Sequence, residues 1–310
     1  MAPSQESRQL GELFKWISAN FPTDGNHDLE RICYGRVREA GTEAPGVSIS
    51  DMVIDAAGLK VPCKWFTPEN TGSATHVILF CHGGGFSFGS CDSHRKLTAH
   101  LARACGCPAL SVDYRLAPEH KYPAALDDCV AGYQYLLNQG YVAGKIVIAG
   151  DSVGGCLSAA VPLAAMRKGL PTMGASVSLS PLYDQSTVEG GTMVSNKDKD
   201  FINTAEFVTL LGDRYLGGTG ASRTDSTVSP LFASDNELKR MPPTWISIAG
   251  DDMLRDHGER MAEKLKNAGV DVVSVVHGGQ QHVMEFMVGN APEADKSISD
   301  IATWVKGKVS

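Results

Sequence analysis

A serine framed by glycines, in the pattern Gly-x-Ser-x-Gly, is the first feature of this sequence that could carry chemistry. The pattern occurs at residues 85–89, around Ser87, and again at 150–154, around Ser152. In enzymes that use a nucleophilic serine, it forms a sharp turn between a strand and a helix. Only the second copy has that setting, because the apolar run at 145–149 precedes it and a helix-like stretch follows. We therefore predict that Ser152 is a nucleophile and that Ser87 is a chance match.

A serine hydroxyl is a weak nucleophile and needs a histidine base that a carboxylate orients. In folds with this turn, the acid and then the base follow the serine along the chain. Of the later histidines, His257 falls in a helix-like stretch and is expected to be solvated, whereas His277 ends a strand and is expected to be half-buried. His282 follows that strand on a loop, where a catalytic base belongs. We therefore predict His282 as the base.

The acid and the groups that bind an oxyanion are also expected directly after strands. The apolar run at 244–249 leads into Asp251 and Asp252, and the spacing alone leaves both open as the acid. A glycine run follows His82 after an earlier apolar run, and glycines let bare backbone N–H groups approach a substrate. Together with the N–H of Val153, that run predicts an oxyanion hole.

The elements that must position these groups alternate between short apolar runs and amphipathic helical stretches. Unbroken apolar runs of this length are typical of parallel strands buried on both sides. The strand candidates lie at 76–80, 108–113, 145–149, 175–180, 244–249 and 270–276. Helical stripes lie between them, as at Leu126, Val130, Tyr133 and Leu137. The pattern predicts an α/β fold in which helices cover both faces of a mostly parallel sheet.

Two regions interrupt this alternation. Residues 1–45 contain a helical stripe but no strand candidate, and residues 184–228 separate two strands by more than a crossover needs. Excess helical sequence outside a parallel sheet suggests a cover over the carboxyl ends of its strands, where such folds bind ligands. We predict a cap built from segment 1–45 and an insertion at about 184–228, on a catalytic domain spanning 46–310. The alternative is that the N-terminal stripe packs on the back of the sheet.

Composition argues against several other classes of protein. The 310 residues are 43% hydrophobic and 20% charged with a formal net charge of −7, unlike a nucleic-acid-binding protein. The apolar runs are too short to span a membrane, and residues 1–16 lack the pattern of a secretory signal. The eight cysteines have neither disulfide-like nor metal-ligand spacing. We therefore predict reduced core cysteines, a cytoplasmic protein, and no metal or organic cofactor.

Several longer motifs resemble the hormone-sensitive lipase family, the bacterial-type esterases of the α/β-hydrolase fold. They are HGGGF at 82–86, DYRLAPEH at 113–120, YPAALDD at 122–128, GDSVGG at 150–155, SPL at 180–182 and AGDDMLRD at 249–256. The resemblance covers most of the chain after about residue 50. It implies a mostly parallel, eight-stranded sheet with helices on both faces and a helical cap.

Carried over residue by residue, the resemblance implies a nucleophile, a base and an acid, namely Ser152, His282 and Asp252. It thereby favours Asp252 over Asp251. It also implies three oxyanion donors, namely Gly83, Gly84 and Val153. His82 would be structural rather than catalytic, and a set of polar residues would be buried scaffold, namely Asp113, Tyr114, Arg115, Glu119 and Asp127.

These features predict a serine carboxylesterase that acts on small-molecule esters through an acyl-enzyme. Phe86 and Phe88 are predicted to line and narrow the substrate cleft, and the β-branched Val153 stands where the family usually has alanine. We therefore expect a preference for short acyl chains of about two to six carbons. The alternatives are an amide or lactone hydrolase of the same fold, and a non-catalytic small-ligand receptor, which His282 disfavours. The resemblance also implies pairing into a homodimer.

Overall fold

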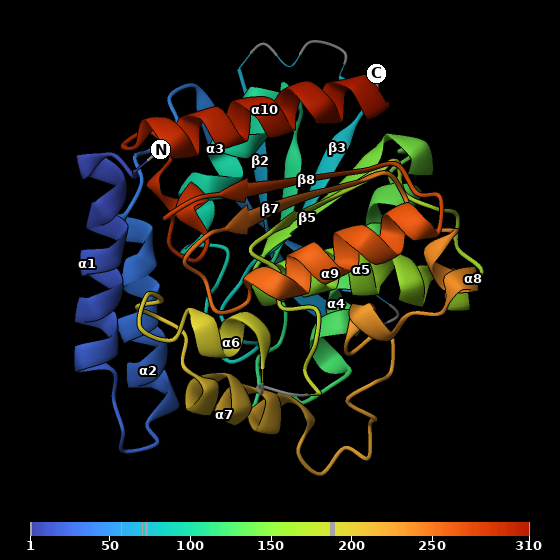
Figure 1. Cartoon of the computed structure of the whole chain (residues 1–310). Coiled ribbons are helices and arrows are strands. Elements are labelled where there is room, and N and C mark those ends of the chain that lie inside the picture. The colour runs from blue at the N-terminus through green and yellow to red at the C-terminus, as the bar shows by residue number, and fades with distance from the viewer. Residues whose placement is uncertain (1, 57, 70, 72–73, 187–189, 310) are drawn as a thin grey trace.

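A central mixed sheet organises the computed structural model, which describes residues 2–56, 58–69, 71, 74–186 and 190–309 (Figure 1). Its strands stand in the order β1–β2–β4–β3–β5–β6–β7–β8. β2 is antiparallel to both of its neighbours, and the other neighbouring pairs in this sheet are parallel. The strands span Val47–Ala56 (β1), Leu59–Pro68 (β2), Val77–Cys81 (β3), Ala109–Val112 (β4), Ile146–Asp151 (β5), Ala175–Leu179 (β6), Thr244–Ala249 (β7) and Val272–His277 (β8). The predicted eight-stranded, mostly parallel sheet is confirmed.

The first two strands fall where the sequence indicated none. In β2, burial alternates from residue to residue: Lys60 and Pro62 are exposed, whereas Val61 and Cys63 are buried. This alternation arises because β1 and β2 form an antiparallel outer pair with one face toward solvent. Unbroken apolar runs therefore do not mark β1 and β2. They do mark the other six strands, β3 to β8, which form the parallel part of the sheet.

Helices cover both faces of the sheet. On one face lie α3 (Arg95–Cys105) and α10 (Pro292–Val309), and on the other lie α4 (Ala124–Asn138), α5 (Val153–Arg167) and α9 (Arg255–Asn267) (Figure 1). The central strand β3 is buried on both sides, because successive side chains enter different cores. Ile78 and Phe80 pack with the α3 and α10 side, and Leu79 packs with the α4 and α5 side.

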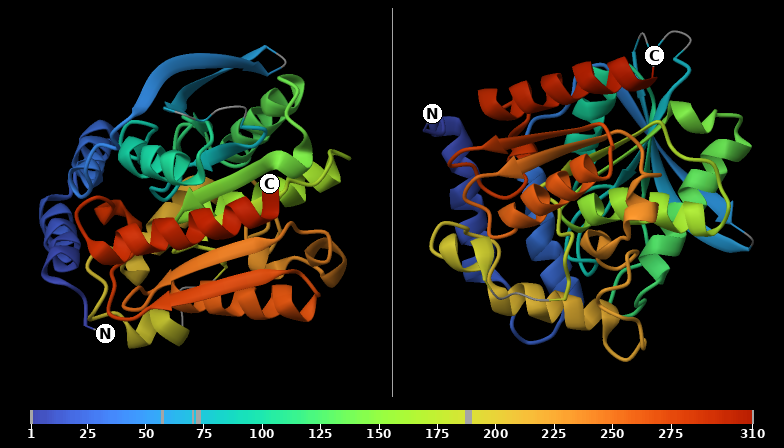
Figure 2. Two further views of the ribbon diagram at one scale, coloured as in Figure 1. Left: turned by 90° about the horizontal axis from the view of Figure 1, so that it is seen from above. Right: turned by 45° about the vertical axis from the view of Figure 1, so that its right-hand side comes forward.

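Most of the remaining helices belong to the N-terminal segment or to the chain between β6 and β7. The exceptions are two short helices, at 143–145 before β5 and at 284–287 after β8. The first two, α1 and α2, lie next to α6 and α7 in Figure 1 and in the right-hand view of Figure 2, although about 150 residues separate the two pairs in the sequence. These helices and the short ones span Gln5–Asn20 (α1), His27–Tyr34 (α2), Gly35–Glu39 (η1), Ala143–Lys145 (η2), Gly191–Ser195 (α6), Ala205–Leu216 (α7), Pro230–Phe232 (η3), Asp235–Leu238 (α8) and Met284–Met287 (η4).

An ion pair and an aromatic contact join the two helical segments. Arg214 on α7 holds the buried carboxylate of Glu30 on α2, with Nη1 2.8 Å from Oε2. Phe21, which follows α1, meets the ring of Phe207 on α7 edge-on, with 5.5 Å between the ring centroids. The N-terminal segment therefore contacts the insertion, and α1 also packs against η4 and α10.

The prediction that five polar residues form buried scaffold is correct for Tyr114 and wrong for Glu119 and Asp127. Tyr114 is buried, Asp113 and Arg115 are half-buried, and Glu119 and Asp127 are exposed. The buried carboxylate on this part of α4 is Asp128, which pairs with the Arg115 guanidinium through Oδ1 and Nη2 at 2.8 Å. The side chains of neighbouring helical residues point about 100° apart, so Asp127 can face solvent while Asp128 beside it faces the core.

All eight cysteines are unpaired and buried, as predicted for small core residues. Within the described residues, no helix is long and apolar enough to cross a membrane.

Candidate active site

Ser152 stands on a tight turn between β5 and the first residue of α5. Its φ angle is 54°, a conformation that non-glycine residues rarely adopt. The flanking glycines are required by close packing. A Cβ atom on Gly154 would collide with the carbonyl oxygen of Cys81 at the end of β3, and one on Gly150 would collide with the backbone of Gly154. This is the strand–turn–helix setting that the sequence predicted for Ser152 and that exposes a serine hydroxyl above a sheet.

His282 and Asp252 are brought together by two loops that follow β8 and β7. The imidazole Nδ1 lies 2.6 Å from Asp252 Oδ2, and both side chains are buried. The backbone N–H of Leu254 donates to the other carboxylate oxygen at 2.8 Å, which fixes its orientation. Of the two carboxylates that the spacing left open, Asp252 is therefore the one that holds the imidazole, and its neighbour Asp251 is half-buried.

The other histidines lie elsewhere. The prediction that His257 is solvated is wrong, because the side chain is 3% exposed and faces the core side of α9. His277 is half-buried at the end of β8, as expected. His82 is buried and stacks on Tyr114, with 4.1 Å between ring centroids. Burial, aided by the charge of His94, lowers the pKa of His82 to about 3, so this imidazole is neutral and structural.

The glycine loop after β3 contributes two residues to the cavity at Ser152. Gly84 and Gly85 line the same cavity as Ser152, Val153 and His282. Both have positive φ angles, 113° and 61°, which favour glycine. Among the described residues, neither of these N–H groups has a protein acceptor. They are available to an oxyanion in the cavity, together with the N–H of Val153 at the start of α5.

Gly83 is a correction to the predicted oxyanion donors. Its N–H points away from the cavity and donates to the buried carboxylate of Asp151, at 3.0 Å from Oδ1. A Cβ atom at this position would collide with the same carboxylate. Gly83 therefore anchors the loop, and Gly85 takes its place as a candidate donor.

Asp151 and His94 form a buried support beneath this loop that the sequence analysis missed. His94 Nε2 lies 3.2 Å from Asp151 Oδ2, and its Nδ1 lies 2.8 Å from the hydroxyl of Ser93. The carboxylate thus links the turn at Ser152 to the glycine loop and to the start of α3. The presence of Asp151 within the Gly-x-Ser-x-Gly pattern was the one sequence signal for this role, and nothing local marked His94.

Polar side chains of the insertion hold the loop that carries Asp252. Asn196 Nδ2 donates to the carbonyl oxygen of Asp252 at 2.8 Å. The carboxylate of Asp200 accepts the N–H of Met253 at 2.9 Å and the side chain of Asn203 at 3.0 Å. These residues lie in a polar stretch whose sequence resembles a surface loop, so only the fold reveals that Asn196, Asp200 and Asn203 are buried.

Two buried groups at the site have raised pKa values. Burial and the charge of Asp252 raise the pKa of Asp200 to about 6. For His282, burial alone would lower the pKa, but the charge and hydrogen bond of Asp252, followed by the charges of Asp200 and Asp151, raise it above its ordinary value. A base with a raised pKa is protonated, and therefore inactive, up to a higher pH.

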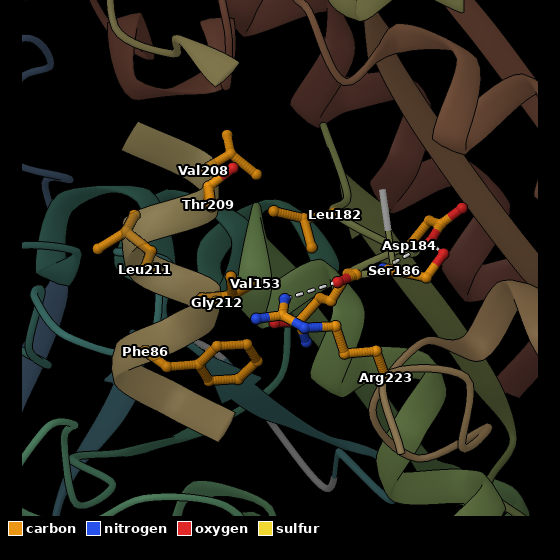
Figure 3. Close-up of a pocket in the computed structure, with 12 residues that line it drawn as sticks. Phe86, Val153, Leu182, Asp184, Ser186, Val208, Thr209, Leu211, Gly212 and Arg223 are labelled. Atoms are coloured by element: carbon orange, nitrogen blue, oxygen red, sulfur yellow. Dashed lines mark hydrogen bonds between the residues drawn. The ribbon is translucent and has the colours of Figure 1, made fainter. Parts of the chain in front are cut away.

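Two adjoining cavities open beside Ser152. The first is lined by Ser152, His282 and mostly apolar side chains, among them Phe88. The second has a volume of about 230 Å³, begins at Val153 and includes Phe86 (Figure 3). Both phenylalanines that the sequence predicted as substrate-binding therefore line a cavity at the site, although Phe86 also stacks on Tyr215.

Comparison with known proteins identifies the family of this chain. Residues 78–286 match the profile of a family described as having the alpha/beta hydrolase fold. The crystal structure of an esterase from the bacterial hormone-sensitive lipase family superposes with a TM-score of 0.90 and 30% sequence identity, covering 100% of both chains. The chain belongs to this family of α/β-hydrolases.

Relatives in the family include an acetyl-hydrolase from Streptomyces hygroscopicus, which is 31% identical over 94% of this chain and 92% of its own. An ethyl acetate hydrolase from Pseudomonas putida is 32% identical over 81% of this chain and 80% of its own. This family member is accordingly a serine carboxylester hydrolase, and the predicted enzyme class is confirmed.

The raised pKa of His282 generates a prediction about pH dependence. Asp200→Asn removes one negative charge near the imidazole but keeps an oxygen that can accept the N–H of Met253. We expect the pKa of His282 to fall, so the base stays neutral to a lower pH and the acid limb of kcat/KM moves to lower pH. The measurement is kcat/KM for p-nitrophenyl acetate from about pH 5 to about pH 9.

Asp198→Asn is the matched control, because Asp198 is an exposed carboxylate in the same stretch. It should leave the acid limb in place. An acid limb that stays where it is in Asp200→Asn, or moves to higher pH, would contradict the electrostatic role of Asp200.

Proposed function

We propose that this hydrolase cleaves esters through a Ser152–His282–Asp252 triad and an acyl-enzyme intermediate. The observation that carries the proposal is the 2.6 Å hydrogen bond between His282 Nδ1 and Asp252 Oδ2 in a cavity that Ser152 also lines. Asp252 holds the imidazole with Nε2 free to act as a base, which is the arrangement that activates a serine hydroxyl.

The proposed reaction begins when Ser152 Oγ attacks the ester carbonyl carbon and His282 Nε2 takes the hydroxyl proton. The carbonyl oxygen becomes an oxyanion, which accepts hydrogen bonds from the N–H groups of Gly84, Gly85 and Val153. Removal of one such donor costs about 2.7–4 kcal/mol of barrier in a well-measured protease. The C–O bond then breaks, and His282 returns the proton to the departing alcohol.

Water completes the cycle. His282 takes a proton from a water molecule as the water oxygen attacks the acyl carbon. The second tetrahedral intermediate then collapses, the bond to Ser152 Oγ breaks, and His282 returns the proton to Oγ as the acid leaves. Each proton moves between His282, Ser152, water and the alcohol, so these steps use no metal or organic cofactor.

We also propose that residues 1–45 and the insertion at about 184–228 act as a cap on the catalytic domain 46–310. The Arg214–Glu30 ion pair supports this proposal because it joins the two segments. Both segments also contribute apolar side chains to the cavity at Ser152, including Phe14 from α1 and Phe207 from α7. Such a layer would exclude water from the acyl transfer step.

Two further proposals concern the state of the protein in the cell. The eight unpaired cysteines support a reducing compartment, the cytoplasm.

The edge strand β8, on which Val276 is 43% exposed, supports a homodimer in which two copies pair along this edge. Light scattering should then give the mass of two chains, and a monomer mass at micromolar concentration would contradict the dimer.

The triad proposal predicts different outcomes for the two glycine-framed serines. Ser152→Ala should abolish hydrolysis of p-nitrophenyl acetate, because the acyl group passes through that hydroxyl. Ser87→Ala should leave most of the rate, because Ser87 is buried and its hydroxyl is not among the groups that line the cavity of Ser152 and His282. Initial rates of both variants provide the test, and an active Ser152→Ala protein would overturn the proposal.

We propose that the preferred substrates carry short acyl groups. The names of the two relatives, an acetyl-hydrolase and an ethyl acetate hydrolase, support this preference. The buried ring of Phe86 lines one cavity and that of Phe88 lines the other, and Val153 lines both cavities. A chain that outgrows the space must displace side chains, at a cost of roughly 1–3 kcal/mol.

For p-nitrophenyl esters from acetate to palmitate, kcat/KM should peak at about two to six acyl carbons and then fall. The rise reflects burial of added methylenes, and the fall reflects overpacking. A continuous rise through dodecanoate, or activation at an oil–water interface, would instead indicate a lipase.

A further inference from the structure

The two cavities at Ser152 are two lobes of one site, because five residues line both of them, namely Gly85, Val153, Leu182, Val208 and Leu211. We call the lobe lined by Ser152 and His282 the apolar lobe, and the lobe of about 230 Å³ beyond Val153 the polar-ended lobe (Figure 3). An ester bound at Ser152 has two arms, an acyl arm and an alcohol arm, which leave the reacting carbon in different directions.

The position of His282 decides which arm enters which lobe. The alcohol oxygen must receive its proton from His282 Nε2, so the alcohol arm leaves on the side of the imidazole. His282 lines the apolar lobe and is absent from the lining of the polar-ended lobe. The acyl arm therefore extends past Val153 into the polar-ended lobe.

The polar-ended lobe is also lined by side chains that can form hydrogen bonds, and Arg223 is the positively charged one. The Arg223 side chain reaches across the lobe toward Gly212 on α7 (Figure 3). Its Nη1 donates to the carbonyl oxygen of Gln185 at 2.8 Å, and its Nη2 pairs with Asp213. A guanidinium has five N–H donors, so these two bonds leave donors for a ligand in the lobe.

The acidic residue in the same lobe is balanced by other groups. Asp184 is buried, its Oδ1 accepts the N–H of Ser186 at 2.8 Å, and its Oδ2 lies 3.4 Å from Arg260 Nη1. Arg260 does not line the lobe. Among the described residues that line this lobe, Arg223 is therefore the one that carries positively charged N–H donors.

Gly212 makes this placement of Arg223 possible. It lies within α7, and a Cβ atom there would stand 2.8 Å from Arg223 Nη1. Alanine is a better helix former than glycine, so α7 alone gives no reason for a glycine at this position. The glycine leaves space for the guanidinium to pack across the helix.

We propose that Arg223 is a specificity-determining residue that selects short acyl groups with a hydrogen-bond-accepting oxygen at their far end. A plain alkyl chain of the same length would cover the guanidinium without satisfying its donors, which is unfavourable. An acyl group with a terminal ketone or hydroxyl oxygen would accept a hydrogen bond from it. This inference rests on the proposed esterase function, and it adds the substrate class.

The test uses two p-nitrophenyl esters with acyl chains of equal length, the 4-oxopentanoate and the pentanoate. They differ only in a ketone oxygen near the far end of the acyl chain. We expect the wild-type protein to prefer the 4-oxopentanoate in kcat/KM by about tenfold, and Arg223→Leu to remove that preference. The loss should appear mainly in KM for the oxo ester, and octanoate should become a better substrate.

Two companion variants separate specificity from general damage. Arg167→Leu is the matched control, because Arg167 is an ion-paired arginine outside both lobes, and it should keep the wild-type ratio. Gly212→Ala keeps the arginine but places a methyl group against its Nη1, so it should also lower the ratio. This second variant provides the test if Arg223→Leu fails to fold.

The possible results separate an error in the role of Arg223 from an error in the proposed esterase function. If the wild-type protein hydrolyses both esters with equal kcat/KM, or if Arg223→Leu and Gly212→Ala retain the wild-type ratio, the role of Arg223 is wrong while the esterase function stands. If the wild-type protein hydrolyses neither ester nor p-nitrophenyl acetate, the proposed function itself fails.

Discussion

The site depends on how closely the start of α5 approaches the end of β3. Gly154 packs so tightly against the carbonyl oxygen of Cys81 that no side chain fits between them. This contact holds Ser152 on its strained turn, with a φ angle of 54°. It also brings the nucleophile beside the glycine loop, because that loop begins at the residue after Cys81. One steric constraint therefore positions both the Ser152 side chain and the glycine loop whose N–H groups we propose as oxyanion donors.

Buried polar groups then fix the parts that steric packing leaves free. Asp151 ties the glycine loop to the turn through the N–H of Gly83, while Asp200 and Asn196 in the insertion hold the backbone around Asp252. Buried carboxylates are costly unless they are paired or hydrogen-bonded, and here backbone N–H groups satisfy them. Their charges also raise the pKa of the imidazole that they surround. The insertion thus contributes to the electrostatics of the base as well as to the walls of the cavity.

The parts of the fold that the sequence predicted are those with strong local patterns. Unbroken apolar runs marked the strands that came after residue 76. Five of these strands, β3 to β7, are buried on both faces, and the run also marked the half-buried edge strand β8. The outer pair β1 and β2 was missed because one face meets solvent and the apolar pattern alternates with polar residues. His257 was misjudged for a related reason, since the periodicity of α9 does not by itself say which stripe faces the sheet.

The sequence by itself determined the class of chemistry and pointed to Ser152 as the proposed nucleophile, because a strand, a turn and a helix around Ser152 are local in the chain. The tertiary structure decided between neighbours, placing Asp252 rather than Asp251 on His282 and turning the N–H of Gly83 away from the cavity. It alone brought Arg223 to the polar-ended lobe. Adjacent residues point in different directions, and distant ones meet only after folding, so spacing along the chain cannot resolve either question.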